Sequence, residues 1–434
     1  MTSAAPETDL HPSFKDQWLV FGQIGLQSFG GPAAQISLMH KLLVDDRKWL
    51  SENRFLNALN YCMLLPGPEA MQLATYAGWR VAGISGGLIA GLLFVLPGAA
   101  FMLALALIYS FYGTLPLIAT LFLGIKAAVL VIVLEALLKV SKKALKSAAH
   151  WGVAGFAFIA IFFLQIPFPF IILAAALLGF FAFRNAHPVE SHSQTPALSR
   201  FYSVKIIGFG LLIWFGPLLL LSLLPGTHLL TEIGIFFSKL AVVTFGGAYA
   251  VLAYMSQDVV STYGWLTTGE MMDGLGLAET TPGPLILVTE FVAFLSAFKA
   301  EGLLSALVAT VVCLWVTFVP CFIWIFAGAP YLERITSHPR LNGAFSAVTA
   351  TVVGVILNLS VWFAQHVLFQ TLETKDKGLI TLLQPQFTTL QLDVVTLVLL
   401  NLIMLFFLKW KIGTMLLLSA GAAWVISFIP NLLA

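Results

Sequence analysis

Two glycine-containing motifs, each present twice and one of them with two prolines, are the parts of this chain best suited to chemistry. The four copies are Phe29-Gly30-Gly31, Pro66-Gly67-Pro68, Phe245-Gly246-Gly247 and Pro282-Gly283-Pro284. Proline fits the first turn of a helix, and glycine lets the backbone approach a ligand closely. Each motif therefore predicts a helix that begins inside the protein, with free N–H groups and the positive end of its dipole. Such helix N-termini bind anions without a cationic side chain.

Hydroxyl and ammonium groups extend this anion-binding interpretation. Four hydroxyls beside the motifs can donate further hydrogen bonds, and they belong to Ser28, Thr244, Thr280 and Thr281. Lys126 lies inside an apolar stretch, where it either balances a dianion or extends its ammonium group toward the membrane interface. We predict that these side chains and the four motifs bind the substrate. The alternative for the motifs is structural, since such breaks also kink helices that cross.

Two carboxylates flank the proline-containing motifs. Glu69 follows Pro68 directly, and Glu279 lies three residues before Pro282. A carboxylate repels a bound anion unless it takes up a proton, so we interpret both as proton-coupling residues. Glu69 has an alternative role, which is to cap the helix that begins after Pro68.

The composition places these motifs in a membrane. Apolar residues make up 59% of the 434 residues and charged residues 10%, and the mean hydropathy is +0.94. Soluble domains carry about 25% charged residues. The formal net charge of +2 and the absence of basic clusters give no indication of nucleic acid binding. We therefore expect an all-α polytopic membrane protein.

Nine segments are apolar and long enough, or nearly so, to cross a bilayer. They are 83–112, 118–140, 150–165, 168–184, 201–225, 302–328, 343–369, 392–408 and 412–430. The four motifs interrupt four further segments, at 14–44, 51–82, 229–258 and 267–298. Each interrupted segment is either a kinked span or a re-entrant hairpin, so the fold has nine spans with four hairpins, or thirteen segments in all.

An internal repeat organises these segments. One constant shift, the first register, superposes both kinds of motif and also Trp49 on Trp265, and a slightly longer shift, the second register, superposes Pro97 on Pro320 further along the chain. The predicted divisions are a polar N-terminus (1–13), a first repeat (14–184), a linker with one extra helix (185–228) and a second repeat (229–430). An odd number of spans between two equal units inverts the second unit, a plan common in secondary transporters.

The distribution of positive charge predicts the orientation. In the hairpin interpretation sixteen of the 22 Lys and Arg residues lie on one face and three on the other. Cytoplasmic loops carry the excess of Lys and Arg. We therefore expect a cytoplasmic N-terminus, and the charge distribution favours hairpins over kinked spans.

Several functional classes lack support in the sequence. No phosphate-binding loop, dinucleotide-binding motif or catalytic triad is recognisable, so we expect neither an enzyme nor an ATP-driven pump. The three cysteines are isolated in apolar stretches, and no histidine pair has metal-binding spacing within a span. We expect no metal and no cofactor.

Taken together, the motifs resemble the chromate ion transporter family in its long, two-domain form. The resemblance rests on FGGPAAQISLMHKLLVDDRKWLS and LLPGPEAMQLATYAGW in the first repeat, and on FGGAYAVLAYM, GWLT and GLAETTPGPLILVTEFVAF in the second. GIKAAVLVIVLEAL and AVTATVVGVILNL are similar to that family as well. Both repeats are covered, which makes the signature specific.

This resemblance implies export of chromate across the bacterial inner membrane, driven by the proton gradient or the membrane potential. Sulfate, a tetrahedral dianion of similar shape, is the expected competitor. We expect alternating access around an anion site near the middle of the bilayer, and a homodimer is a further possibility. Two alternatives stay open, namely a transporter of sulfate or another oxyanion with the same fold, and an uncoupled anion channel.

Overall fold

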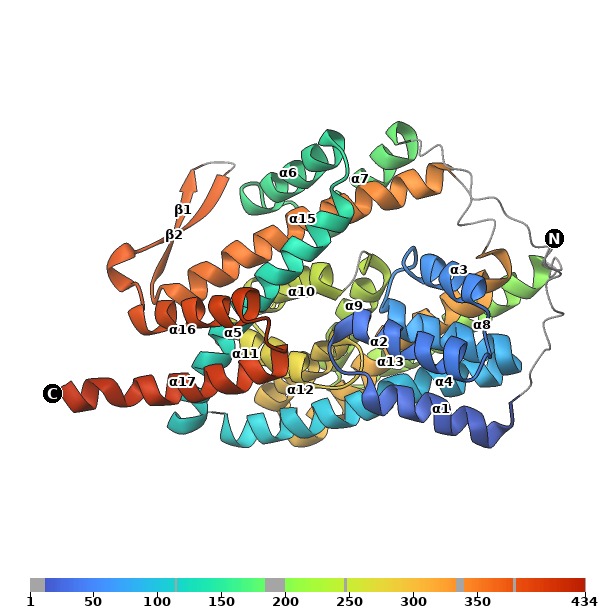
Figure 1. Ribbon diagram of the computed structural model, residues 1–434, viewed down its shortest axis with the longest axis horizontal. Coiled ribbons are helices and arrows are strands. Elements are labelled where there is room, and N and C mark those ends of the chain that lie inside the picture. Colours follow the sequence, from blue (N-terminus) through green and yellow to red (C-terminus); the bar gives the residue numbers. More distant parts are fainter. Residues whose placement is uncertain are drawn as a thin grey trace.

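The structure is a computed structural model that describes residues 12–113, 115–183, 200–245, 248–332, 339–377 and 380–433. It is almost entirely helical, which confirms the predicted fold class (Figure 1). One two-stranded antiparallel hairpin, β1 (Leu372–Lys377) with β2 (Ile380–Pro385), is present in the described chain. Many large apolar side chains are exposed on the outer faces of the helices, as expected where lipid replaces water.

The first repeat contains seven helices in the part that the structure describes. They are α1 (Phe14–Gln27), α2 (Gly31–His40), α3 (Glu52–Cys62), α4 (Glu69–Tyr112), α5 (Pro116–Ala144), α6 (Ala148–Phe162) and α7 (Phe168–Ala182). A π-helical turn, Lys41–Asp46, continues α2. The break after α1 and the break before α4 fall at the two predicted motifs.

The second repeat follows one additional helix, α8 (Arg200–Ser222). Its helices are α9 (His228–Val243), α10 (Ala248–Gln257), α11 (Thr268–Thr280), α12 (Val288–Glu301), α13 (Leu303–Gly328), α15 (Pro339–Leu368), α16 (Leu392–Leu402) and α17 (Ile412–Leu433). A π-helical turn, Asp258–Thr262, continues α10 just as one continues α2. A short 3₁₀ turn, Leu285–Leu287, precedes α12, and a π-helical turn, Ile403–Phe407, continues α16.

The nine predicted spans all coincide with apolar helices. Five helices of the described chain are long and apolar enough to cross a membrane, and four shorter apolar helices match the remaining predictions. The sequence predicts that a span begins at residue 83, whereas α4 begins at Glu69. A change of direction within α4 accounts for this difference. Ala82 and Gly83 have non-helical backbone angles, so α4 consists of an arm, 69–81, and a long span, 84–112. Gly302, with a φ of 88°, separates α12 from α13 in the same way.

An ion pair shows how the interrupted segment 267–298 of the second repeat folds. Glu270 near the start of α11 and Lys299 near the end of α12 approach within 2.8 Å. Both ends of this segment therefore lie at the same end of the molecule, as the hairpin interpretation predicts.

The equivalent hairpin of the first repeat lies at the other end of α13. Its Tyr61 hydroxyl donates a hydrogen bond to the carbonyl of Trp324, close to the C-terminus of α13, at 3.0 Å. Gly302 and the α11–α12 hairpin lie at the N-terminus of α13. The inverted orientation of the two repeats in a membrane stays a prediction.

The two repeats also exchange helices. Helices α6 and α7 pack along α15 of the other repeat, whereas α16 and α17 pack along α5 (Figure 1). Glycines permit these close approaches, since Gly179 contacts the Gly343 backbone and Gly124 contacts the Ser419 backbone. Helices in lipid depend on such close packing because lipid is as apolar as their side chains.

We expect Gly354→Leu to destabilise the protein, because α15 is in backbone contact with α6 at this position. A side chain there would overlap the Ala154 carbonyl, and overpacking costs about 1–3 kcal/mol. Gly155→Leu on α6 is the matched control, since no atom lies within 4 Å of its added Cβ. Thermal unfolding of the purified protein in detergent should show a lower midpoint for Gly354→Leu alone. Equal midpoints for both variants would contradict this packing.

Candidate functional site

Two reciprocal hydrogen bonds join the breaks of the two repeats. The Gly67 N–H donates to the Thr244 carbonyl, and the Gly283 N–H donates to the Ser28 carbonyl, each at 2.8 Å. The first register of the repeat converts one bond into the other. The buried Gln35 side chain strengthens the second junction, because its Nε2 donates to the Gly283 carbonyl at 2.7 Å and to the Ser28 carbonyl at 3.2 Å. The interrupted backbone of each repeat is thus satisfied by the other repeat.

Glycine is required at these breaks by the backbone angles. Gly30, Gly31, Gly67 and Gly283 have φ values of 87°, 78°, 118° and 88°, which other residues adopt only with strain. New helices begin directly after them, with Pro32 in the first turn of α2 and Pro68 as the residue before α4. The sequence thereby ends one helix and starts the next within a few residues.

A cavity of about 660 Å³ lies at the junction of the two repeats. Exposed Lys139 and Lys143 place its mouth at the C-terminal end of α5, beside Asn342 near the start of α15. The other polar and motif residues that line it are Gly30, Gly31, Pro32, Asn57, Asn60, Gly67, Glu69, Glu135, Phe245, Tyr249, Glu279, Ser346 and Thr349.

Four helix starts converge on this cavity. Gly31 and Pro32 line it at the start of α2, and Glu69 lines it at the start of α4. Tyr249 in the first turn of α10 and Leu285 in the 3₁₀ turn before α12 contribute from the second repeat. Residues from the first turns of α2, α4 and α10 and from the 3₁₀ turn before α12 therefore line one common space, and anion binding by these helix starts stays a prediction.

The carboxylates predicted beside the motifs both face the cavity. The Tyr249 hydroxyl donates a hydrogen bond to Oε1 of Glu279 at 2.9 Å, while Glu69 occupies the first turn of α4. Nearer the mouth, Glu135 and Lys139 form an ion pair of 2.7 Å. The cavity thus carries Lys139, Lys143 and Glu135 at its mouth and the carboxylates of Glu69 and Glu279 elsewhere in its lining.

The four predicted hydroxyl donors do not line the cavity. Each donates instead to a backbone carbonyl three or four residues earlier in its own helix, and these bonds are Ser28 to Ile24 (2.5 Å), Thr244 to Leu240 (2.6 Å), Thr280 to Leu277 (2.7 Å) and Thr281 to Ala278 (2.9 Å). A hydroxyl has a single proton to donate. In this structure these protons satisfy helix ends.

The structure separates Lys126 from the other predicted site residues. Its Nζ lies 3.3 Å from Oδ1 of Asp273 on α11, and Lys126 is not a cavity-lining residue. Phe29 is half exposed outside the cavity lining, whereas Phe245 lines it. Gly246 and Gly247 lie outside the described residues.

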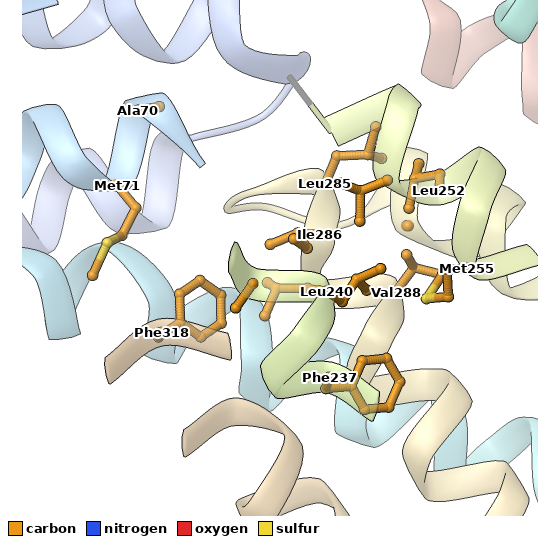
Figure 2. Close-up of a cluster of buried hydrophobic side chains, with 14 of the residues drawn as sticks. Ala70, Met71, Phe237, Leu240, Leu252, Met255, Leu285, Ile286, Val288 and Phe318 are labelled. Carbon is orange, nitrogen blue, oxygen red and sulfur yellow. The ribbon is translucent and has the colours of Figure 1, made fainter. Parts of the chain in front are cut away.

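The prolines of the two Pro-Gly-Pro motifs are buried and shape the breaks. The side chains that follow the second motif anchor it in an apolar cluster. Figure 2 shows Leu285, Ile286 and Val288 among side chains of α9, α10 and α13, which include Phe237, Leu240, Leu252, Met255 and Phe318. The cavity therefore has one firmly packed side.

Polar residues that the sequence analysis missed line the cavity from α3 and α15. Asn57 and Asn60 share one face of α3, and Ser346 and Thr349 share one face of α15. Their three-residue spacing, which places each pair on one face of its helix, is the signal that identifies them. Glu290, in contrast, is fully buried, and both carboxylate oxygens lack a hydrogen-bond partner within the described chain.

The fold and this cavity define a multi-pass membrane protein with broken helices around a central polar site, the class to which transporters belong. A family model described as chromate transporter matches residues 16–180 and 231–426. The chain belongs to this family.

Curated relatives cover most of the chain. It is 30% identical to a chromate transport protein of Pseudomonas aeruginosa, over 84% of this chain and 83% of the relative. It is 29% identical to a probable chromate transport protein of Synechococcus elongatus, over 80% and 84%. It is 27% identical to a chromate transport protein of Cupriavidus metallidurans, over 84% and 86%. No solved structure is significantly similar.

We expect Gly67→Ala to destabilise the protein more than Gly302→Ala. Both glycines have positive φ, where an alanine costs about 1–2 kcal/mol. Only at Gly67 does the added Cβ also lie 2.7 Å from Nε2 of Gln72 and 2.9 Å from Sγ of Cys321. Gly302 has open space around it, so it isolates the effect of φ alone. Thermal unfolding midpoints measure the difference, and an equal loss in both variants would show that the junction tolerates the methyl group.

Proposed function

We propose that the protein exports chromate from the cytoplasm by alternating access at an anion site between its two repeats, driven by the proton gradient or the membrane potential. The observation that carries this proposal is the convergence of four helix starts on one cavity in a chain of the chromate transporter family. Three relatives that are named as chromate transport proteins or as a probable one point to the same substrate.

The orientation proposed from the basic residues assigns the cavity mouth to the cytoplasm. Lys143 at the mouth attracts a dianion and raises its local concentration, whereas Lys139 is held in its ion pair with Glu135. Backbone N–H groups at the starts of α2 and α4, and the amides of Asn57 and Asn60, are suited to bind its oxygens. The N-terminus is then cytoplasmic, and the two repeats, 14–184 and 229–430, are inverted relative to each other.

Proton coupling is assigned to Glu69 and Glu279. Both carboxylates face the space that the dianion occupies, and like charges at short distance in a membrane protein are costly. Protonation of either group removes this repulsion, so occupancy by substrate and by protons is linked. The Tyr249 hydroxyl, which hydrogen-bonds to Glu279, holds that side chain toward the cavity.

Uptake of chromate by inside-out membrane vesicles tests the proposal. We expect saturable uptake that depends on the protein, is inhibited by excess sulfate and is reduced by a protonophore. Transport of sulfate or another oxyanion in place of chromate would contradict the proposed substrate but would support the proposed anion site. Flux that neither saturates nor responds to a protonophore would identify an anion channel. Vesicles without any anion flux would overturn the proposal.

We expect Glu69→Gln and Glu279→Gln to abolish the protonophore-sensitive part of uptake while exchange of labelled for unlabelled chromate persists. The amide keeps the shape of the side chain but binds no proton in this range. Glu301→Gln, at the exposed end of α12, is the matched control and should leave both activities unchanged. Wild-type coupling in both cavity variants would remove these carboxylates from the mechanism.

A further inference from the structure

A second polar cluster lies on the opposite side of the breaks from the cavity. The Nζ of Lys126 on α5 lies 3.3 Å from Oδ1 of Asp273 on α11, and the Tyr109 hydroxyl on α4 donates to Oδ2 of the same carboxylate at 2.8 Å. The Asp273 side chain is only 6% exposed. Three elements from both repeats thus meet at one partly buried charge pair, in which the Lys126 side chain is 24% exposed and which the cavity does not include.

The internal repeat relates this cluster to the cavity. The first register, which places Trp49 on Trp265, takes Asn57 to Asp273 and Asn60 to Gly276, both from α3 to α11. The second register, which places Pro97 on Pro320, takes Ile125 to Val348 and Lys126 to Thr349, both from α5 to α15. Asn57 and Thr349, the equivalents of Asp273 and Lys126, line the open cavity, and so do Asn60 and Val348, the equivalents of Gly276 and Ile125.

The two equivalent positions differ in packing. Between α3 and α15 the four residues face open space. Between α11 and α5 the helices are in contact, since a Cβ on Gly276 would overlap the Ile125 side chain. A Cβ on Gly269 would lie 3.3 Å from Nζ of Lys126. The passage that is open at one face is therefore closed at the other.

The charges of Lys126 and Asp273 determine when the contact between α11 and α5 can open. Separation of a buried ion pair leaves two uncompensated charges, which is strongly unfavourable unless another group replaces one partner. A dianionic substrate is such a replacement for Asp273 beside Lys126. The pair would hold the passage closed without substrate and release it when the anion arrives.

We infer that Lys126, Asp273 and Tyr109 form the gate that closes the transport pathway at the face opposite the cavity. Opening moves the α11–α12 hairpin away from α5, and Lys126 then exchanges the Asp273 carboxylate for the transported oxyanion. The identity of the oxyanion rests on the proposed function. The gate itself concerns only whether α11 and α5 alternate between a closed and an open arrangement.

Thiol labelling from each face tests the gate directly. A chain whose three native cysteines are replaced by alanine carries one reporter, Leu123→Cys beside the gate or Ser346→Cys in the cavity. These two positions are equivalent in the second register of the repeat. A membrane-impermeant maleimide should label Ser346→Cys rapidly from the Lys139 face and Leu123→Cys slowly from the opposite face.

Replacement of the pair by the residues at the equivalent positions should open the gate. We expect Lys126→Thr with Asp273→Asn to increase labelling of Leu123→Cys about five-fold or more, a typical conformational coupling, and to slow labelling of Ser346→Cys. The reciprocal variant, Thr349→Lys with Asn57→Asp, builds a pair across the cavity and should protect Ser346→Cys. Lys126→Asp with Asp273→Lys keeps a pair and should restore the original pattern.

Removal of the Glu270–Lys299 pair is the matched control. This pair joins the two arms of one hairpin, which move together, so Glu270→Gln with Lys299→Gln should leave both labelling rates unchanged. Unchanged labelling in the Lys126 and Asp273 variants and in the reciprocal variant, in protein that elutes as a single species, would overturn the gate. Labelling that shifts in protein that transports no anion would support the gate and refute the proposed function. Active transport with unshifted labelling would support the proposed function and overturn the gate.

Discussion

The structure depends on one constraint, which is that backbone N–H and C=O groups interrupted within a membrane need partners inside the protein. The two repeats meet this constraint for each other. The Gly67 N–H and the Gly283 N–H reach carbonyls at the first break of the opposite repeat, and Gln35 adds donors at one of the two junctions. Helices can then start at the centre of the protein with their first N–H groups directed at a cavity, and the remaining helices form the frame that holds these starts in place.

Much of this arrangement was predictable because it follows from residue types with strong local preferences. Glycine at positive φ and proline at a helix start specify the breaks almost independently of their surroundings. The nine apolar segments are equally local signals. The division into two repeats is a prediction from motif spacing alone, and the family model matches the chain in two segments, 16–180 and 231–426.

The positions of individual side chains were less predictable because tertiary contacts decide them. The hydroxyls of Ser28 and Thr244 bond to their own helices, an option that sequence proximity to a motif cannot exclude. Lys126 depends on Asp273, which lies in the other repeat and was not recognised as its partner. Asn57 and Asn60 gain significance only because α3 and α15 stand apart at one face. The internal repeat identifies positions that the two halves share, whereas the proposed site and gate use positions at which the residues of the two halves differ.

The reciprocal hydrogen bonds have a mechanical consequence. They join the α3–α4 and α11–α12 hairpins to the first breaks of the opposite repeats, so the proposed movement of a hairpin against the frame displaces atoms little at the breaks and increasingly with distance from them. The breaks are then the pivot of this movement, and the helices of the hairpins are the parts that move. A small rotation would be enough to separate α11 from α5 at one end while it brings α3 toward α15 at the other. In the proposed mechanism a bound anion would barely move during this step, because the pathway closes on one side of the anion and opens on the other.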